Sequence, residues 1–280
     1  MLAPLIFGLV VFAVYPFVFL VFLSFSDSTL ANQFNGWLGW DNFVWSFEGT
    51  DFPETLQRTI IFALSASVIQ MCAGFMIAWL LFTAFQDQKF VRALILLPLM
   101  TPPVAVGVTW KLLFNTNGWF NTALMSLGLV SEPISFLGEG HYAFPAIMAA
   151  DTWQWTPFIV ILCYAALVSL PKSVFEAAAI DGAYRRQMLL HVIVPMLWPQ
   201  LLAVFLIRLI IAFKTFDLVY VLTFGGPGNA TNISSFEIWK TAMREFDLGL
   251  AAAQTLILAV VVTVVTLPVV LWHKHVDARR

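Results

Sequence analysis

Long apolar stretches dominate this chain and limit what it can fold into. About 20 mostly apolar residues are needed for one helix to cross the hydrocarbon layer of a membrane. Six stretches meet that requirement, and helices of this length exclude a membrane β-barrel, whose strands are short and alternate between apolar and polar residues. The expected spans are residues 2–25, 59–85, 93–114, 143–170, 198–223 and 248–272.

Composition supports the same class. The 280 residues are 60% hydrophobic and 11% charged, with a mean hydropathy of +0.87, whereas roughly a quarter of the residues of a soluble domain are charged. The net charge of −2 and the absence of a long Lys/Arg cluster give no reason to expect nucleic-acid binding. The first span has no basic flank before it and no small-residue cleavage site after it, so we expect a retained helix and not a signal peptide. A truncated or misassigned start at Met1 stays open.

Charges in the connections predict the orientation, because basic residues concentrate on the cytoplasmic side. One set of connections is basic and holds Lys89, Arg92, Lys172, Arg185, Arg186, Lys274, Arg279 and Arg280. The other set has few basic residues (Arg58, Lys240, Arg244) and collects Asp27, Asp41, Glu48, Asp51, Glu54, Glu132, Glu139, Glu237, Glu245 and Asp247. Both termini and the connection between the fourth and fifth spans are therefore expected in the cytoplasm.

That connection, residues 171–197, carries the most specific motif of the chain. It contains Glu-Ala-Ala-Ala-Ile-Asp-Gly at residues 176–182, followed by Val192, Pro195 and Pro199. The pattern resembles the EAA loop of ABC-importer permeases. The departures are mild, with Val192, Val194 and Leu189 at positions where that family more often has Ile, Leu and Phe.

Three further segments extend the resemblance over most of the chain. They are Gly-Trp-Asp-Asn-Phe at 39–43, Trp-Gln-Trp-Thr-Pro-Phe at 153–158, and Phe-Lys-Thr-Phe-Asp at 213–217 with the Gly-Gly-Pro turn that follows at 225–227. Together they are similar to the carbohydrate branch of type I ABC importers, whose members move sugars, polyols and glycerol phosphates.

The resemblance implies an all-α type I importer permease, a single domain over residues 1–280, in the bacterial cytoplasmic (inner) membrane. It implies two ATPase subunits that bind ATP and Mg, a second permease subunit, an extracytoplasmic solute-binding protein and a sugar-like cargo, neutral or anionic. We expect the second permease to be a different chain, with a homodimer as the open alternative. The sequence contains no Gly-x-x-x-x-Gly-Lys-Ser/Thr loop, so energy from ATP must come from another polypeptide. No cofactor and no enzymatic activity are expected in this chain.

Local chemistry explains why the 171–197 segment suits docking. Pro171 ends the fourth span, and Ser173 with Glu176 fits a capping box for a short helix. Small side chains would let that helix lie deep in a partner's groove, and Gly182 permits a sharp turn. Glu176 would tie the helix to the ATPase cleft or serve only in the cap, and a helix resting on lipid headgroups is the alternative. The predicted ATPase-docking residues are Glu176, Ala177, Ala178, Ala179, Asp181 and Gly182.

Polar groups inside the fifth span need partners, because isolated charges in a membrane are costly. Arg208 lies about ten residues past Trp198, roughly 15 Å along the helix, near the bilayer centre. Asp217 falls on the opposite helix face, where it can pair with Lys214, and Asp151 is expected near the outer boundary. Arg208 is therefore expected to bind backbone carbonyls or an acid on a companion permease, or else to face the cavity and meet the cargo.

Aromatic residues beside these polar groups suit the faces and hydroxyl edges of a sugar, although plain helix packing explains each of them equally well. The candidate substrate path is Asp151, Trp153, Trp155, Arg208, Phe213, Lys214, Phe216, Asp217 and Tyr220. Other tryptophans are expected to anchor the chain at the membrane–water boundaries, namely Trp37, Trp40, Trp45, Trp119, Trp239 and Trp272. Cys72 and Cys163 are expected to pack in apolar surroundings, and the four histidines form no metal-binding pattern.

Two other classes of function compete with the permease. A stand-alone ion-coupled secondary transporter would need an inverted repeat or paired broken helices, and no internal repeat is evident. A membrane enzyme would need clustered acid, base or metal ligands near one interface, and none is apparent. The permease hypothesis predicts that the chain copurifies with ATPase subunits.

Overall fold

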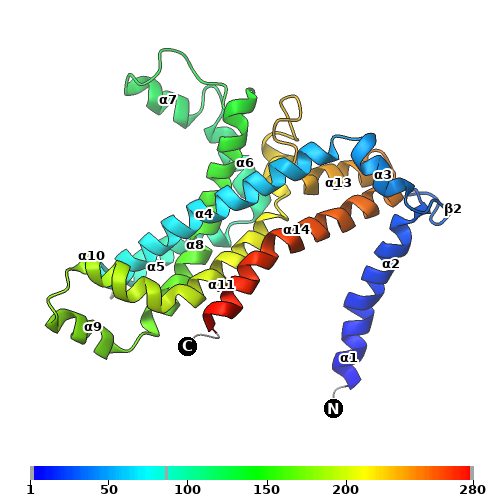
Figure 1. Ribbon diagram of the computed structural model, residues 1–280. Coiled ribbons are helices and arrows are strands. Elements are labelled where there is room, and N and C mark those ends of the chain that lie inside the picture. The colour runs from blue at the N-terminus through cyan, green and yellow to red at the C-terminus, as the bar shows by residue number, and fades with distance from the viewer. Residues whose placement is uncertain (1–2, 86–87, 278–280) are drawn as a thin grey trace. The chain divides into compact units, whose positions relative to one another are not determined.

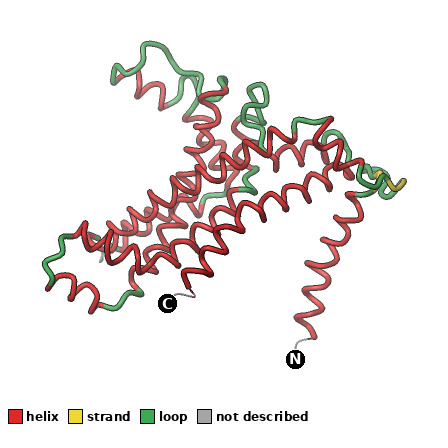
Figure 2. The backbone as a smooth tube through the Cα atoms, in the orientation of Figure 1, coloured by secondary structure: helices red, strands yellow, loops and turns green. Residues whose placement is uncertain are grey.

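The computed structural model describes residues 3–85 and 88–277, with the side chains of residues 3, 89, 179 and 273–277 outside the description. Most of the described chain is helical (Figures 1 and 2). It forms two compact units, one of Met1–Ile60 with Asn232–Val264 and one of Ile61–Thr231 with Val265–Arg280. The single permease domain over residues 1–280 stays a prediction. Met1, Arg279 and Arg280, on which the start and orientation arguments partly rest, lie outside the described residues.

The first unit begins with one long helix that contains a π-helical stretch. Its elements are α1 (Ala3–Leu9), the π-helical Val10–Val14, α2 (Tyr15–Ser24), β1 (Ser26–Asp27), β2 (Gly36–Trp37), α3 (Asp41–Glu48), the start of α4 (Phe52–Ala84), α13 (Ser234–Met243) and most of α14 (Leu248–Asp277). The strands pair antiparallel, Ser26 opposite Trp37.

The second unit holds the rest of α4 and the remaining helices. These are α5 (Lys89–Met100), α6 (Pro103–Leu113), α7 (Trp119–Ser126), α8 (Gly140–Val168), α9 (Lys172–Ile180), α10 (Arg185–Gln187), the π-helical Met188–Ile193, α11 (Val194–Ala212) and α12 (Asp217–Leu222). Within this unit α8 is central and packs against α5, α6, α11 and α12.

Five helices of the described chain are long and apolar enough to cross a membrane, and a bent pair makes a sixth if it counts as one span. The five are Pro4–Ser24, Phe52–Ala84, Gly140–Val168, Arg185–Ala212 and Leu248–Trp272. This confirms an all-α protein with about six spans, several of them longer than the apolar stretches suggest.

The predicted third span, 93–114, is wrong as a continuous helix. The first helix ends at Met100, and the two helical halves are bent by 95° relative to each other. Thr101 has an extended backbone with ψ 128°, because a residue before proline avoids the α conformation. Pro102 is extended too, and Pro103 then starts α6 with its fixed φ.

The predicted fifth span, 198–223, is also wrong as one helix. The helical path begins earlier, at Arg185, and α11 ends at Ala212. Residues 213–216 are irregular, with Phe216 at φ −138° and ψ −54°, before α12 starts at Asp217. No proline or glycine marks this break, so packing and not a local backbone restriction produces it.

The first unit is tied together by buried polar contacts near the start of α4. The Thr59 hydroxyl donates to Ser234 Oγ over 3.0 Å and accepts from the Ser234 backbone N–H over 2.8 Å. In α13, Lys240 donates to the buried carboxylate of Glu237 at 3.2 Å. Burial by itself would lower the pKa of Lys240, but the hydrogen bond and the negative charge of Glu237 raise it above the usual lysine value. The Thr59–Ser234 hydrogen bonds join α13 to the start of α4, whereas the Lys240–Glu237 pair lies within α13.

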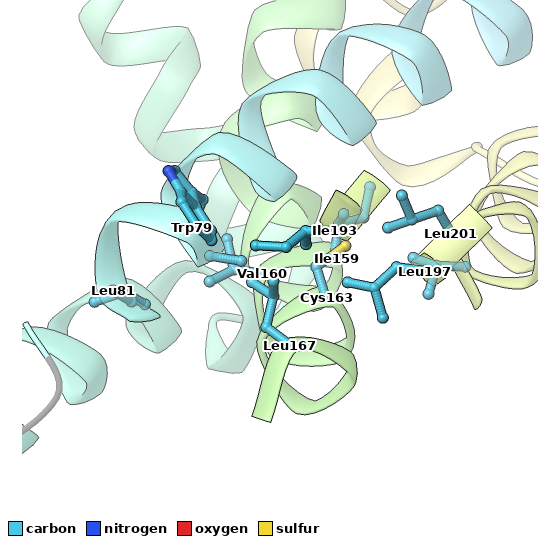
Figure 3. Packing of buried hydrophobic residues seen from close by; sticks show 11 residues of the cluster. Trp79, Leu81, Ile159, Val160, Cys163, Leu167, Ile193, Leu197 and Leu201 are labelled. Carbon is cyan, nitrogen blue, oxygen red and sulfur yellow. The ribbon is translucent and has the colours of Figure 1, made fainter. Parts of the chain in front are cut away.

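The core of the second unit lies between α4, α8, the π-helical Met188–Ile193 and α11. Figure 3 shows Trp79, Ile159, Cys163, Ile193 and Leu197 meeting there from these segments. Close approach of α4 to α8 depends on Gly74, where an added Cβ would lie 2.7 Å from the Cγ2 atom of Ile159. The predicted packing role of Cys163 is confirmed by its burial, whereas Cys72 is exposed, and both are free thiols.

Candidate functional site

Arg208 is completely buried and finds its partners inside its own chain. It donates from Nη2 to Asp151 Oδ2 and from Nε to Gln70 Oε1, and Gln70 Nε2 donates to the same Asp151 oxygen over 2.7 Å. The prediction that Arg208 pairs with backbone carbonyls or a companion subunit is therefore wrong. Asp151 lies at the level of Arg208, and its position near the outer boundary stays a prediction.

The cluster is neutral but not fully satisfied. Asp151 Oδ1 and Arg208 Nη1 are buried and have no hydrogen-bond partner. The guanidinium carbon of Arg208 also lies 5.3 Å from the ring centroid of Trp155, in the range of a cation–π contact. One unused acceptor and one unused donor thus remain in an ion pair that links α4, α8 and α11, although buried polar groups are normally paired.

A small cavity of about 120 Å³ lies beside this cluster. Residues of α6, α8, α11 and α12 and two helix interruptions meet at it: Pro103 follows the α5–α6 interruption, and Thr215 belongs to the α11–α12 interruption. Backbone without helical hydrogen bonds is tolerated at membrane depth only where protein covers it or a cavity hydrates it. The lining residues are Pro103, Asp151, Gln154, Trp155, Ile211, Lys214, Thr215, Phe216, Asp217 and Leu218.

The cavity brings together five of the nine substrate-path candidates, namely Asp151, Trp155, Lys214, Phe216 and Asp217. Arg208 contacts Asp151 but is not among the residues that line the cavity. Trp153 instead packs edge-on against Trp110, Phe213 is buried, and Tyr220 stacks on Phe216 with ring centroids 5.4 Å apart.

The expected ion pair between Lys214 and Asp217 is absent from the described residues, because the helix that would align them is interrupted there. Gln70 and Gln154 are site residues that the sequence patterns did not predict. Gln154 Nε2 donates to the Thr101 carbonyl in the α5–α6 break over 3.3 Å. Polar residues within apolar spans were the available signal for both.

The predicted docking segment forms a short helix, α9, held beyond the ends of its neighbours by two loops (Figure 1). Gly182 has φ +71°, so the predicted sharp turn is confirmed. The Ala183 N–H donates to the Ala178 carbonyl over 3.0 Å, which closes the helix end. The capping box at Ser173 is wrong, because α9 already begins at Lys172 and Ser173 lies inside its first turn.

A side-chain hydrogen bond forms instead at the next helix start. The Gln187 side chain accepts from the Tyr184 backbone N–H over 3.0 Å. Because α9 begins before Ser173, the side chain of Glu176 has no capping role. Its role as a tie to the ATPase, and the docking roles of Ala177, Ala178, Ala179, Asp181 and Gly182, stay predictions. The side chain of Ala179 lies outside the described residues.

The two faces of α9 differ. Ser173, Glu176, Ala177 and Ile180 are exposed at spacings of three and four residues, which places them on one face. Ala178 is buried, with Val174 and Phe175 half-buried beside it. Ile180, which was not among the predicted docking residues, is 87% exposed. A large apolar side chain between charged residues was the signal for it.

Phe175 attaches α9 to the core of the second unit. Its ring centroid lies 5.4 Å from that of Phe82 at the end of α4, and Phe82 stacks on Trp79 at 6.1 Å. A groove of about 630 Å³ runs alongside, lined by Phe82, Tyr164, Val168, Leu170, Lys172, Phe175 and Glu176. An aromatic chain therefore connects the exposed helix to buried residues of α4.

Comparison with known proteins decides the family. The model of the family described as binding-protein-dependent transport system inner membrane component matches residues 70–280. The chain belongs to this family. It is thus a permease component, a multi-pass inner-membrane protein and not itself an enzyme. No group of three or more potential metal ligands occurs among the residues the structure describes.

Relatives and solved structures agree with this assignment. The permease is 30% identical over 272 residues to the trehalose/maltose transport system permease protein MalF of Thermococcus litoralis, covering 96% of this chain and 92% of that protein. It is 26% identical over 268 residues to the sn-glycerol-3-phosphate transport system permease protein UgpA of Brucella abortus, covering 95% and 90%. A chain of a bacterial ABC transporter that imports the acidic polysaccharide alginate superimposes with a TM-score of 0.86 at 22% identity, over 98% of this permease and 94% of that chain. This match confirms the type I importer permease fold.

Proposed function

We propose that this permease forms half of an ATP-driven importer for a sugar or a sugar-like solute. A second permease subunit, expected to be a different chain, supplies the other half of the path. Two ATPase subunits, which hold ATP and Mg, dock on the exposed face of α9, and an extracytoplasmic binding protein delivers the solute. Both termini and α9 lie in the cytoplasm.

The cargo class is supported by what the relatives are named for. Trehalose and maltose, sn-glycerol 3-phosphate and sulfoquinovosyl glycerol all carry several hydroxyl groups. A solute of this chemistry needs hydrogen-bonding groups and flat apolar rings inside the membrane. The cavity beside Asp151 supplies both from one chain.

The meeting of two chain breaks with the buried charged cluster is the observation that carries the proposal. Interrupted helices beside a cavity indicate a transport path, and secondary transporters use them as well. The family match over residues 70–280 favours the ATP-driven importer over that alternative. Here both interruptions and the Asp151 carboxylate border the same small cavity. A helix bundle that served only as a membrane anchor would gain nothing from a buried ion pair, since such pairs are costly to desolvate.

Energy enters through α9. Closure of the ATPase subunits moves α9 as a rigid body, and Phe175 transmits that movement to Phe82 and the core of the second unit. Helices α4, α8 and α11 then shift around the cavity and change the side from which it is reached.

Reconstitution tests the proposal. Liposomes containing both permeases and both ATPases, with binding protein added outside, should accumulate a labelled sugar only when ATP is enclosed. The control is the same complex with a hydrolysis-deficient ATPase, in which uptake should stop. Uptake by this chain alone, driven by an ion gradient without ATPase subunits, would instead establish a secondary transporter and contradict the proposal.

A further inference from the structure

The charge of the cargo is a separate question from the existence of the importer. The relatives include permeases named for uncharged sugars and permeases named for a phosphorylated solute, so the comparisons leave the charge open. Building on the proposed function, we propose that the cavity beside Asp151 holds an uncharged, hydroxyl-bearing end of the cargo and rejects phosphorylated or carboxylated forms.

The unused oxygen of Asp151 is the first reason. Oδ1 is buried, accepts no hydrogen bond and belongs to a residue that lines the cavity. An ionised carboxylate only accepts hydrogen bonds, so its partner must be a donor. A hydroxyl group meets this need and can also accept a hydrogen bond from another group. An ionised phosphate or carboxylate carries acceptors only and would place like charges in contact.

The charge balance around the cavity is the second reason. Lys214 and Asp217 line it with opposite charges, and Asp151 is matched by Arg208 behind it. Recognition of an anion generally uses a surplus of positive charge, often a guanidinium presenting two parallel donors. Arg208 does not present two free parallel donors, because Nε and Nη2 are already bound to Gln70 and Asp151 and Nη1 is the one unpaired nitrogen of its guanidinium. The four charged groups therefore sum to zero, which favours an uncharged solute.

Size and aromatic lining complete the argument. At about 120 Å³ the cavity is smaller than the ~300–1,000 Å³ of typical small-molecule sites. It therefore accommodates one end of a sugar and not a whole disaccharide. Trp155 and Phe216 provide flat rings for the apolar edge of that end, next to the polar groups that fix its hydroxyls.

The test compares the binding of matched ligands to the assembled importer in nanodiscs. The binding protein is left out, because its own selectivity would mask that of the permease. The probes are single sugar units small enough for the cavity, namely glucose with glucuronate, mannose with mannose 6-phosphate, and glucosamine as a cationic control. Weak binding is measured by saturation-transfer NMR. We expect each uncharged sugar to bind at least about tenfold more tightly than its anionic partner, because like charges at a binding site are strongly unfavourable.

Two variants that change the charge of the cavity in opposite directions separate an effect on charge selectivity from structural damage. Asp217→Asn removes a negative charge and should narrow the preference for the uncharged sugar severalfold, whereas Lys214→Gln should widen it. Glu132→Gln makes the same kind of change in an exposed loop away from the cavity and should leave the ratio unaltered.

Several outcomes would overturn the inference. The first is tighter binding of the anionic or cationic probe than of the uncharged sugar. The second is a change of the uncharged-to-anionic binding ratio in the same direction in both variants, and the third is no detectable binding of any probe. ATP-dependent uptake of an anionic sugar by the reconstituted importer would leave the proposed function standing and refute only the selectivity.

Discussion

Arg208 shows how a single residue can organise a membrane protein. Its charge would be very costly in a bilayer core without partners, and Asp151, Gln70 and Trp155 supply them from two other helices. Because the pair is buried, each partner depends on the other. Removal of one leaves an uncompensated charge, whereas removal of both leaves only a packing change.

Breaking this pair should therefore destabilise the permease more than deleting it. We expect Arg208→Met or Asp151→Leu to lower the stability of the assembled complex by about 3–5 kcal/mol, and the double variant to recover much of that loss. Thermal unfolding of the purified complex measures this. If the stability lost in the double variant equals the sum of the losses in the two single variants, the two residues act independently.

Transport provides a second measurement on the same residue. Arg208→Met should reduce ATP-dependent uptake, because the residue holds Asp151 in place beside the cavity. If uptake falls while the affinity of the assembled complex for its substrate is unaltered, Arg208 acts on helix packing and not on the cargo. A parallel loss of affinity would indicate that Arg208 acts through the orientation of Asp151.

Helix α4 approaches α8 closely only because position 74 has no side chain. Gly74→Ala would place a methyl group 2.7 Å from the Cγ2 methyl carbon of Ile159, and overpacking of this kind costs roughly 1–3 kcal/mol. We expect a lower melting temperature for the complex. Gly8→Ala is the matched control, since no atom lies within 4 Å of an added Cβ there, and it should not lower the melting temperature.

Helix α9 has one face for a partner and another for its own chain. Ile180→Asp alters only the exposed face and should weaken copurification of the ATPase subunits, because it places a charge where an apolar side chain is 87% exposed. Phe175→Ala alters only the inward face. We expect the ATPases to stay bound while ATP hydrolysis no longer drives uptake.

The ratio of solute transported to ATP hydrolysed distinguishes the two variants. Ile180→Asp should lower hydrolysis and uptake together when compared at equal amounts of permease, whereas Phe175→Ala should lower uptake alone. Loss of ATPase binding in Phe175→Ala would mean that its ring is needed for the shape of α9 and not for transmission.

The permease as a whole is expected to have both termini and α9 in the cytoplasm. In a background without native cysteines, Ile180→Cys should react with a membrane-impermeant thiol reagent only from the cytoplasmic side. Asn117→Cys, in the exposed loop after α6, should react only from the outside. The reverse labelling pattern would place α9 where no ATPase could reach it.

Features that depend on neighbouring residues alone could be predicted without coordinates. Apolar runs long enough to cross a membrane, the turn at Gly182 and the short helix after Pro171 follow from local length, backbone freedom and helix termination. The break at Pro102–Pro103 belongs in this class too, because two adjacent prolines restrict the backbone directly, although it was missed.

The functional centre depends on residues that are far apart in the chain. Gln70, Asp151 and Arg208 meet across three helices, and the break at residues 213–216 has no local cause. Helix periodicity places a residue on a face of its own helix, but it does not specify which helices pack together or at what depth their polar groups meet. The balance between burying charges and pairing them is settled by packing of the whole unit, and so only the folded chain brings the carboxylate, the guanidinium and the two breaks to one cavity.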